Sequence, residues 1–515
     1  MNASWDEKIF NYGYLVTNAP EVKLPSWGSR WNEINVNGLS VCTHPLQKTT
    51  VHHSEEAIFL LIGHAYNPFT LEKDEQAVLR SLATRYNERE KFLDYLDQIT
   101  GVFTCFVVTG SVISVFTDCS GMMGAYYAKE GQLVFCSSHA QLLAELCGFK
   151  TDPYVDKLKS YRFFKLYGRY LPGNLSPYGQ VKRVIPNVEL VISDEIQQKR
   201  FYPRKQYDVC HDEDYYRQVQ SIAHILNNSL QLILEKWKNP AISLTGGMDS
   251  KTTLACAKPE QGEFSYFSYI SLPREATDAY AAQELCNRLG LKHTIYEINT
   301  DVAEYEEFSH ADEIIERHYG YLGKGNSNDV CKRLFLSDIH DFDIEVKSWV
   351  SEIARASRYK QYARKQFSSK PTARQLTTMY KIFLWNRRTA LQTDKVFRKY
   401  LCDSGLTEAL EAYEYPWTEF FVWEIIFGGW GGLVLTGEHK TSGDITIPYN
   451  NRALLDMMIR TPLDKRITDQ LHRDIMNVAD DRIDKMGICV INGNQTRLRA
   501  YCEKLYYEVH SRWPL

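Results

Sequence analysis

Short apolar runs separated by turn residues dominate the first part of the chain. Runs of this length, rich in β-branched and aromatic side chains, are typical of strands. They lie at residues 57–62, 101–108, 112–116 and 133–137. Three more short extended pieces surround the Pro and Gly turns between residues 171 and 203, and a polar stretch follows. The pattern predicts a layered, β-rich domain over residues 1–204.

The periodicity changes after residue 204. Residues 215–238 carry apolar side chains at helical spacing, and a buried strand at 241–244 follows at once. Helices at 251–257 and 278–289 then alternate with strands at 264–271 and 293–298. Strands that alternate with helices predict a parallel sheet, and the pattern beyond about residue 350 is mainly helical. We therefore predict a second domain over residues 205–515, α/β at first and helical towards its end.

Composition and charge narrow the class of protein. A chain of 515 residues exceeds the roughly 250 to 300 residues at which one core stops growing, so two domains are expected. Sixty basic residues against 64 acidic ones give a net charge of −4, and no positive excess indicates a nucleic acid or an anionic membrane. The twelve cysteines are scattered singly, which favours reduced thiols over a zinc site.

No targeting or membrane segment is expected. The N-terminus is polar where a signal peptide has its apolar core. The longest apolar stretch, residues 420–435, contains Glu424 and four glycines and falls short of a bilayer span. We expect a cytoplasmic protein with neither a nucleic acid nor a membrane as partner, and homodimer formation is left open.

The strand at 241–244 runs into the segment Thr-Gly-Gly-Met-Asp-Ser, residues 245–250, and then into a helix. The glycines let the backbone approach a phosphate chain, and the helix N-terminus directs free N–H groups at that anion. Asp249 is suited to holding a Mg²⁺ that bridges phosphate oxygens. The alternative is a strand-to-helix turn without a ligand, and the Walker pattern GxxxxGK[ST] occurs nowhere. We interpret the segment as an ATP site whose contacts come from Ser243, Leu244, Thr245, Gly246, Gly247, Met248, Asp249 and Ser250, with Tyr269 and Ile270 beside the adenine.

The 245–250 segment resembles the SGGxDS loop of the PP-loop ATP pyrophosphatases, with Thr245 in place of Ser. Segments of the first half look like landmarks of the glutaminase-type domain that precedes the PP-loop domain in asparagine synthetase: 101–103, 118–127, 135–139, 170–172 and 200–203. The resemblance implies an α+β N-terminal domain with a β-sandwich of the Ntn-hydrolase type. It implies an α/β PP-loop domain, adenine nucleotide alpha hydrolase-like, after it.

The position of the glutaminase nucleophile departs from this family. The glutaminase needs a cysteine directly after the initiator methionine, and position 2 is Asn here. The first cysteine, Cys42, is too far along the chain to become terminal without processing. The chain is in this respect similar to β-lactam synthetase, carbapenam synthetase and the lasso-peptide cyclases. We expect an N-terminal domain that does not hydrolyse glutamine, with ammonia or a substrate amine as nucleophile.

Glu352 is the candidate partner of Asp249. It follows the strand at which asparagine synthetase reads SGEGxDE, although residues 348–350 replace the family glycines. The resemblance implies that Glu352 helps to hold Mg²⁺ and pyrophosphate, and hard cations prefer such oxygen ligands. An exposed carboxylate at a helix start is the alternative. Asp278 aligns with an acidic residue of the family, or is a helix N-cap.

Residues 421–432 and 444–452 look like the helix and the PFxDR-type loop that close the acceptor side in this family. Glu424 lies inside the apolar helix, so it must be paired or face a cleft. It is either a general base that takes a proton from the attacking amine, or half of a buried ion pair with Arg452 or another cation.

The family also places a catalytic lysine before an LLR-like segment. Asp469 or Gln470 occupies the corresponding position here. We take Lys465 as the catalytic replacement, with Arg466 and Arg473 as alternatives, although solvation at the surface explains each of them equally well.

Together these features predict an ATP- and Mg²⁺-dependent ligase that adenylates a substrate carboxylate and transfers the acyl group to an amine. Its substrates would be small molecules or peptides of natural-product or polysaccharide biosynthesis. One alternative is a catalytically impaired scaffold that binds nucleotide or nothing. Another is a tRNA-modifying PP-loop enzyme, which the single cysteines and the near-neutral charge disfavour.

Overall fold

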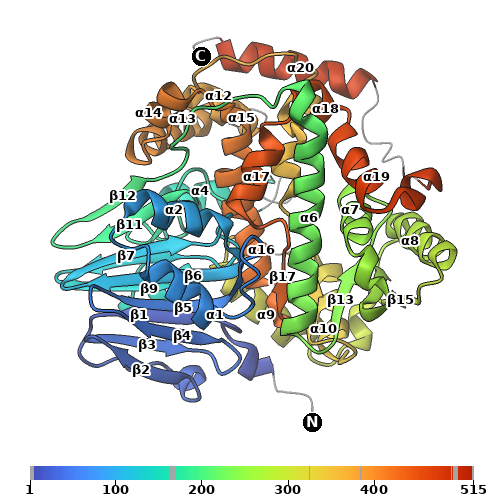
Figure 1. Ribbon diagram of the computed structural model, residues 1–515. Coiled ribbons are helices and arrows are strands. Elements are labelled where there is room, and N and C mark those ends of the chain that lie inside the picture. The colour runs from blue at the N-terminus through green and yellow to red at the C-terminus, as the bar shows by residue number, and fades with distance from the viewer. Residues whose placement is uncertain are drawn as a thin grey trace.

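The computed structural model describes residues 5–162, 166, 169–323, 325–382, 386–488, 490 and 497–512. Its N-terminal half contains two antiparallel sheets of six strands each (Figure 1). The first has the order β10 (Lys182–Arg183), β8 (Tyr126–Glu130), β9 (Leu133–Ser137), β1 (Tyr14–Thr17), β3 (Leu39–Thr43) and β2 (Asn32–Val36). The second has the order β12 (Ile196–Arg200), β11 (Val188–Ile192), β7 (Val112–Thr117), β6 (Thr100–Thr109), β5 (Ile58–Tyr66) and β4 (Thr49–His53). The four apolar runs of the sequence lie in β5, β6, β7 and β9, so these strand predictions are confirmed.

The central strands of this half are covered on both faces. α1 (Glu75–Ala83) contacts β4 and β5, α2 (Arg89–Gln98) contacts α1, and α3 (Ala140–Cys147) contacts β8 and β9. β5 and β6 are buried along nearly their whole length. Such double coverage explains why these strands read as continuous apolar runs instead of alternating ones. α4 (Pro153–Lys159) follows before the chain turns back to β10.

The second half contains a third sheet, which is parallel. Its order is β15 (His293–Glu297), β14 (Ser265–Ile270), β13 (Pro240–Ser243), β16 (Ile344–Val346) and β17 (Ile445–Thr446). The helices that alternate with these strands are α6 (Asp212–Lys236), α7 (Met248–Cys256), α8 (Ala276–Leu289), α9 (Phe308–His318) and α10 (Ser327–Ser337). The predicted alternation is confirmed, and the structure is a mixed α/β arrangement of sheets and helices. The chain enters α6 after residues 201–211, where the predicted boundary at 204 lies; the boundary itself stays a prediction.

The strand order of the parallel sheet reverses beside its first strand. β13 is paired with β14 on one side and with β16, the fourth strand, on the other. Connections that leave neighbouring strands in opposite directions open a crevice at the carboxyl ends of those strands, where α/β proteins bind ligands. The 245–250 turn begins at the carboxyl end of β13. The segment after β16 begins beside it.

The remaining helices follow one another along the last third of the chain, and many of them lie in the upper part of Figure 1. They are α11 (Ser357–Gln361), α12 (Ala373–Met379), α13 (Arg387–Asp403), α14 (Leu406–Tyr413), α15 (Trp417–Phe420), a π-helical segment (Phe421–Gly431), α16 (Gly432–Gly437), α17 (Arg452–Ile459), α18 (Leu463–Ile467), α19 (Gln470–Lys485) and α20 (Arg497–Arg512). The helix Trp417–Thr441 is long and apolar enough to span a membrane by length and composition. Its most apolar window is 78% buried inside the protein, which is typical of a core helix.

The apolar helix packs against the N-terminal half. Trp423 Nε1 donates a hydrogen bond to the backbone oxygen of Cys119 at 2.8 Å. A Cβ atom on Gly432 would lie 2.4 Å from the backbone oxygen of Gly121, so a larger residue would push the helix away. The glycines of this stretch therefore allow close contact between the two halves.

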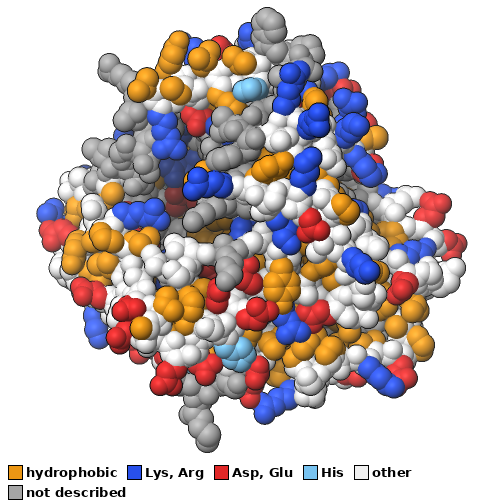
Figure 2. All heavy atoms as spheres, turned by 180° about the vertical axis from the view of Figure 1, so that it is seen from behind, with side chains coloured by type: hydrophobic (Ala, Val, Ile, Leu, Met, Phe, Trp, Pro, Cys, Tyr) orange, Lys and Arg blue, Asp and Glu red, His pale blue; other side chains and the backbone are white. Residues whose placement is uncertain are grey.

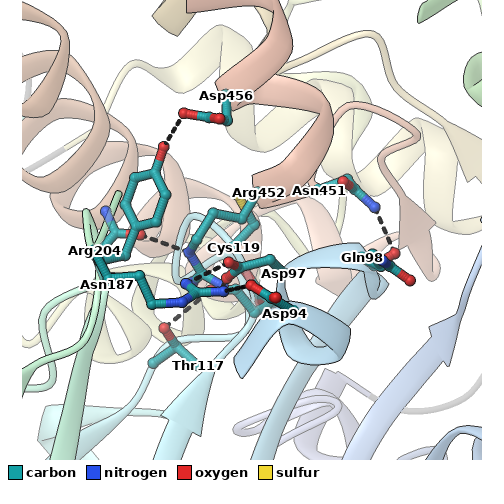
Figure 3. A network of polar contacts seen from close by, with 12 residues as sticks. Asp94, Asp97, Gln98, Thr117, Cys119, Asn187, Arg204, Asn451, Arg452 and Asp456 are labelled. Carbon is teal, nitrogen blue, oxygen red and sulfur yellow. Dashed lines mark hydrogen bonds and ion pairs between the residues drawn. The ribbon is translucent and has the colours of Figure 1, made fainter. Parts of the chain in front are cut away.

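Polar contacts from residues 450–452 bind the same two halves together (Figure 3). Asn450 Nδ2 donates to the backbone oxygen of Gly101 at 2.7 Å, and Arg452 binds Asp97 at 3.0 Å and Asn187 at 2.7 Å. We expected the 444–452 loop to close an acceptor site. Its contacts instead make it part of the interface between the two halves.

Glu424 belongs to this interface as well. Its side chain is fully buried, and the guanidinium of Arg200 binds both of its oxygens, at 2.7 and 2.9 Å. The hydroxyl of Tyr400 donates to it at 2.5 Å, and Asn187 Nδ2 donates at 3.1 Å. A carboxylate with both oxygens bound in this way has no room for an attacking amine. The contacts therefore favour the buried ion pair over the general base, with Arg200 as the cation and not Arg452.

Replacing Glu424 by Gln should lower the free energy of unfolding by about 3 to 5 kcal/mol, because the Arg200 charge stays buried without a counter-charge. Urea denaturation followed by circular dichroism measures the change. The matched control is Glu411→Gln, which breaks the exposed pair with Lys370 and should cost no more than about 1 kcal/mol. Equal midpoints for both variants would contradict a structural role for Glu424.

Candidate functional site

The turn between β13 and α7 is held by its own hydroxyls. Thr245 Oγ1 accepts the backbone N–H of Gly247 at 3.1 Å, and Ser250 Oγ accepts the N–H of Thr245 at 3.2 Å. The two hydroxyl oxygens lie 3.1 Å apart. These bonds fix the turn so that the first N–H groups of α7 point out of the helix, towards the edge of the sheet. The arrangement is suited to binding an anion.

Gly246 lies where only glycine fits. A Cβ atom there would come within 2.2 Å of Val490 Cγ2 and 3.2 Å of Ala281 Cβ. The N–H of Gly246 donates to the carboxylate of Asp278, whose pKa is raised, mainly by burial. Asp278 is not the N-cap of α8, which begins at Ala276. The predicted N-cap role is therefore wrong, and the contact with Gly246 places Asp278 beside the turn.

Not every predicted contact residue of the turn faces the crevice. Leu244 is buried, and its backbone is bonded to β14 through Phe267 and Ser268. Ser243 lies at the end of β13 and donates to the backbone oxygen of Val346. Their positions support the turn. Met248 and Asp249 are the first two residues of α7.

Asp249 is held by groups from two other elements. Ser351 Oγ donates to one of its oxygens at 2.5 Å, and Arg355 Nη1 binds the other at 2.5 Å. His472 Nε2, from α19, lies 3.4 Å from the same carboxylate. Ser351 and Arg355 come from the segment that follows β16, so this segment and the start of α7 meet at the crevice.

Glu352 lies beside Asp249, as the sequence predicted. The residue is half-buried, its buried Oε2 atom has no hydrogen-bond partner among the described residues, and burial together with the Asp249 charge raises its pKa to about 8. It is therefore not an exposed helix-start carboxylate. Val350, which replaces a family glycine, has φ of +80°, a conformation that costs a β-branched residue about 1 to 3 kcal/mol. Val350 thus adopts the left-handed backbone conformation that a glycine would adopt at little cost.

Two cations near Asp249 were not among the predicted site residues. Arg355 Nε and Lys360 Nζ bind Asp469 at 2.9 and 2.6 Å, and these cations lower the pKa of Asp469 to about 2. Asp469 is one of the two residues, with Gln470, that we expected at the position of the family lysine. We call this group the Asp249 cluster: Asp249, Glu352, Arg355, Lys360, Asp469 and His472. No sequence spacing indicates it, because its members come from α7, from the segment after β16, from α11 and from the start of α19.

Lys465 does not join the cluster. Its Nζ atom lies 3.4 Å from Asp212 and 3.5 Å from the centre of the Tyr215 ring, at the start of α6. The ring and the carboxylate account for its position, and we correct its predicted catalytic role on this ground. Arg466 is likewise bound to Glu419 at 2.6 Å in a buried pair.

The molecule also carries a hollow on its rear face. Seen from behind, the surface is hollowed in its upper half, and Lys and Arg side chains gather around the hollow (Figure 2). Positive charge around a concave surface attracts anionic ligands. Tyr269, predicted to flank adenine, lines a separate cavity at the end of β14, and Ile270, the last residue of that strand, is half-buried.

The cysteine thiols of the N-terminal half have raised pKa values. Burial raises the pKa of Cys42 and Cys147 to about 11, and of Cys105, Cys119 and Cys136 to about 12. A thiol is nucleophilic as its thiolate, so these groups are inert at neutral pH. Of the described residues before β1, Asn11 contacts the second half, where its Nδ2 donates to the backbone oxygen of Lys440 at 2.7 Å.

The solved structures described next are only weakly similar to the chain. They are a glutamine phosphoribosylpyrophosphate amidotransferase from B. subtilis with ADP and GMP (10% identity, TM-score 0.24, 56% of this chain and 61% of that one), an allosteric regulatory enzyme of purine biosynthesis (9%, 0.25, 61% and 84%), and a glutamine-dependent NAD⁺ synthetase from Acinetobacter baumannii with ADP (11%, 0.20, 66% and 85%). Such TM-scores are too low to establish a common fold. The match to the first of these structures spans less than two thirds of its length.

A search of curated proteins finds no match. Residues 221–346 match the asparagine synthase family. The matched part runs from within α6 to the end of β16 and contains the 245–250 turn and Asp249. Residues 221–346 are therefore similar to the synthase domain of the asparagine synthase family.

Proposed function

We propose that the chain is an AMP-forming carbon–nitrogen ligase that activates a substrate carboxylate with ATP and joins it to an amine. The observation that carries this proposal is the Asp249 cluster at the switch point of the parallel sheet. There a helix N-terminus, three carboxyl groups and two cations meet at one strand edge. That combination suits a triphosphate, which needs amide donors and positive charge along its length.

The phosphates of ATP would lie on the N–H groups of the 245–250 turn. Arg355 and Lys360 are close enough to Asp249 to stabilise the charge that develops on the leaving pyrophosphate. The carboxylate of the substrate attacks the α-phosphorus, the bond to the β-phosphate breaks, and pyrophosphate leaves. The amine then attacks the acyl-adenylate and AMP leaves.

Asp249 and Glu352 are the residues suited to a divalent cation. Both offer carboxylate oxygens, the donors that Mg²⁺ prefers, and Glu352 Oε2 is buried without a partner among the described residues. A cation beside Glu352 would stabilise the charged form that burial now disfavours. When bound, Mg²⁺ would neutralise charge on the phosphate oxygens. The remaining ligands would be those oxygens and water.

The proposal excludes glutamine hydrolysis as the nitrogen source. The five cysteines of the N-terminal half have raised pKa values, which supports an N-terminal half without a thiol nucleophile. Ammonia or a substrate amine would act directly. The substrates we propose are a small-molecule or peptide carboxylate and an amine, in natural-product or polysaccharide biosynthesis in the cytoplasm.

Replacing Asp249 by Asn should lower ATP–pyrophosphate exchange by about a hundredfold or more, because a carboxylate suited to holding Mg²⁺ at the phosphates is lost. The assay supplies a broad panel of carboxylic acids. Asp481→Asn is the matched control, since its carboxylate binds only Lys485 on α19 and should leave exchange unchanged. Binding of ATP by the unaltered protein, with no exchange for any acid of the panel, would favour the scaffold.

Purified protein supplied with ATP, Mg²⁺, a productive acid and glutamine should release no glutamate above background. Ammonium or the amine substrate in place of glutamine should give amide product, because no activated thiol is needed. Glutamate release at the rate of AMP formation would contradict the proposal. Its loss in Cys42→Ser would identify the nucleophile.

A further inference from the structure

A cavity of about 820 Å³ opens close to the Asp249 cluster and has no part in the phosphate site described above. Its wall includes Tyr269, near the end of β14, and Trp349, three residues beyond the end of β16. These two strands flank β13 in a parallel sheet, so both residues lie at the edge where the 245–250 turn begins. Two residues beyond Trp349, Ser351 already binds Asp249.

Flat rings form one side of this cavity. The rings of Trp349 and Trp430 lie with centres 6.1 Å apart, and His439 meets the Trp349 ring edge-on at 5.0 Å. Both tryptophans are only partly buried, and Lys347 Nζ lies 5.3 Å from the centre of the Trp349 ring. Indole faces bind flat rings through stacking, which adds to the burial of apolar area.

The cavity wall also carries the positively charged side chains of Arg333 and Lys332, and these two side chains donate no hydrogen bond to a described residue. Arg333 is 2% exposed, and no hydrogen bond joins its guanidinium to any described residue; its one ion-pair contact is Glu438, 3.8 Å from Nε. Lys332 reaches Glu275 and Asp329 only at 3.5 and 3.8 Å. Buried arginine nitrogens are almost always hydrogen-bonded in native proteins. A guanidinium that lines a cavity and has no hydrogen-bond partner among the described residues is suited to an oxyanion.

We infer that this cavity binds a substrate with an aromatic ring and an anionic group, the ring on Trp349 and Trp430 and the anion on Arg333. The inference rests on the proposed function and deepens it. The ligand is a substrate only if the chain is a ligase, because the cavity opens at the sheet edge where adenylation would occur. Glu438 and Asp329 limit the number of anionic groups that fit. An aromatic carboxylic acid is the ligand class that meets both features.

Ligand-observed NMR titration of the full chain without ATP tests the inference through binding alone. The probes are terephthalate, its uncharged diamide, and trans-cyclohexane-1,4-dicarboxylate. The diamide should bind about ten to a hundred times more weakly than terephthalate, because the charge-assisted bonds to Arg333 are lost. The cyclohexane acid should bind about three to ten times more weakly, because stacking is lost. Equal affinities for all three probes would overturn the inference.

Two pairs of variants assign the affinity to these residues. Arg333→Gln should reduce the advantage of terephthalate over its diamide to about twofold or less, whereas Arg333→Lys should keep part of it, because the charge remains. Arg274→Gln, an exposed arginine outside the cavity wall, is the control. Trp430→Leu should abolish the preference for the aromatic acid and Trp430→Phe should retain it. Retention of both preferences in Arg333→Gln and Trp430→Leu would overturn the inference.

The experiments distinguish a variant that fails to fold from a failed inference, and a failed cavity assignment from a failed ligase proposal. If Arg333→Gln fails to fold, the comparison of the three probes on the unaltered protein and the Trp430 pair still decide the matter. Binding of terephthalate with the expected preferences, without exchange for any acid, would leave the cavity standing and reject the ligase. Exchange with an acid that has no ring, combined with no aromatic preference in binding, would support the ligase and reject the cavity assignment.

Discussion

Charge balance around Asp249 is the constraint on which the site depends. Its carboxylate at the start of α7 is bound by Arg355, and Arg355 is shared with Asp469, which Lys360 also binds. The carboxylates of Asp249 and Asp469 thus face two cations. Glu352 is a third carboxyl group, and burial and the Asp249 charge raise its pKa. A site that holds an unbalanced carboxyl group beside a helix N-terminus is suited to a ligand that brings both phosphate and a cation.

The fold brings these groups together through the order of the strands. β13 and β16 are neighbours although about a hundred residues separate them, so the two segments that leave their carboxyl ends share one crevice. The interface between the halves depends on other ion pairs, those of Glu424 with Arg200 and of Arg452 with Asp97. Charged residues in the C-terminal half therefore have two separate roles. One set holds the two halves together, and the other surrounds the phosphate site.

Sequence periodicity predicted the elements that carry local signals. The helix at 215–238 and the strand before Gly246 were found because their apolar spacing and the glycine turn are local. Glu352 was placed beside Asp249 only through the family resemblance. Arg355 and Lys360 could not be predicted, because their roles arise from the meeting of distant segments. Glu424 could not be assigned from its apolar surroundings, because its partner Arg200 is more than two hundred residues away.

The central claim is that a substrate carboxylate attacks the α-phosphorus of ATP. A carboxylic acid labelled with ¹⁸O in both oxygens, supplied with ATP, Mg²⁺ and an amine, tests it directly by mass spectrometry of the nucleotide products. The account predicts AMP that carries one ¹⁸O, because one carboxylate oxygen stays on the α-phosphate when the amide forms. Unlabelled AMP, or ADP with label in inorganic phosphate, would contradict it.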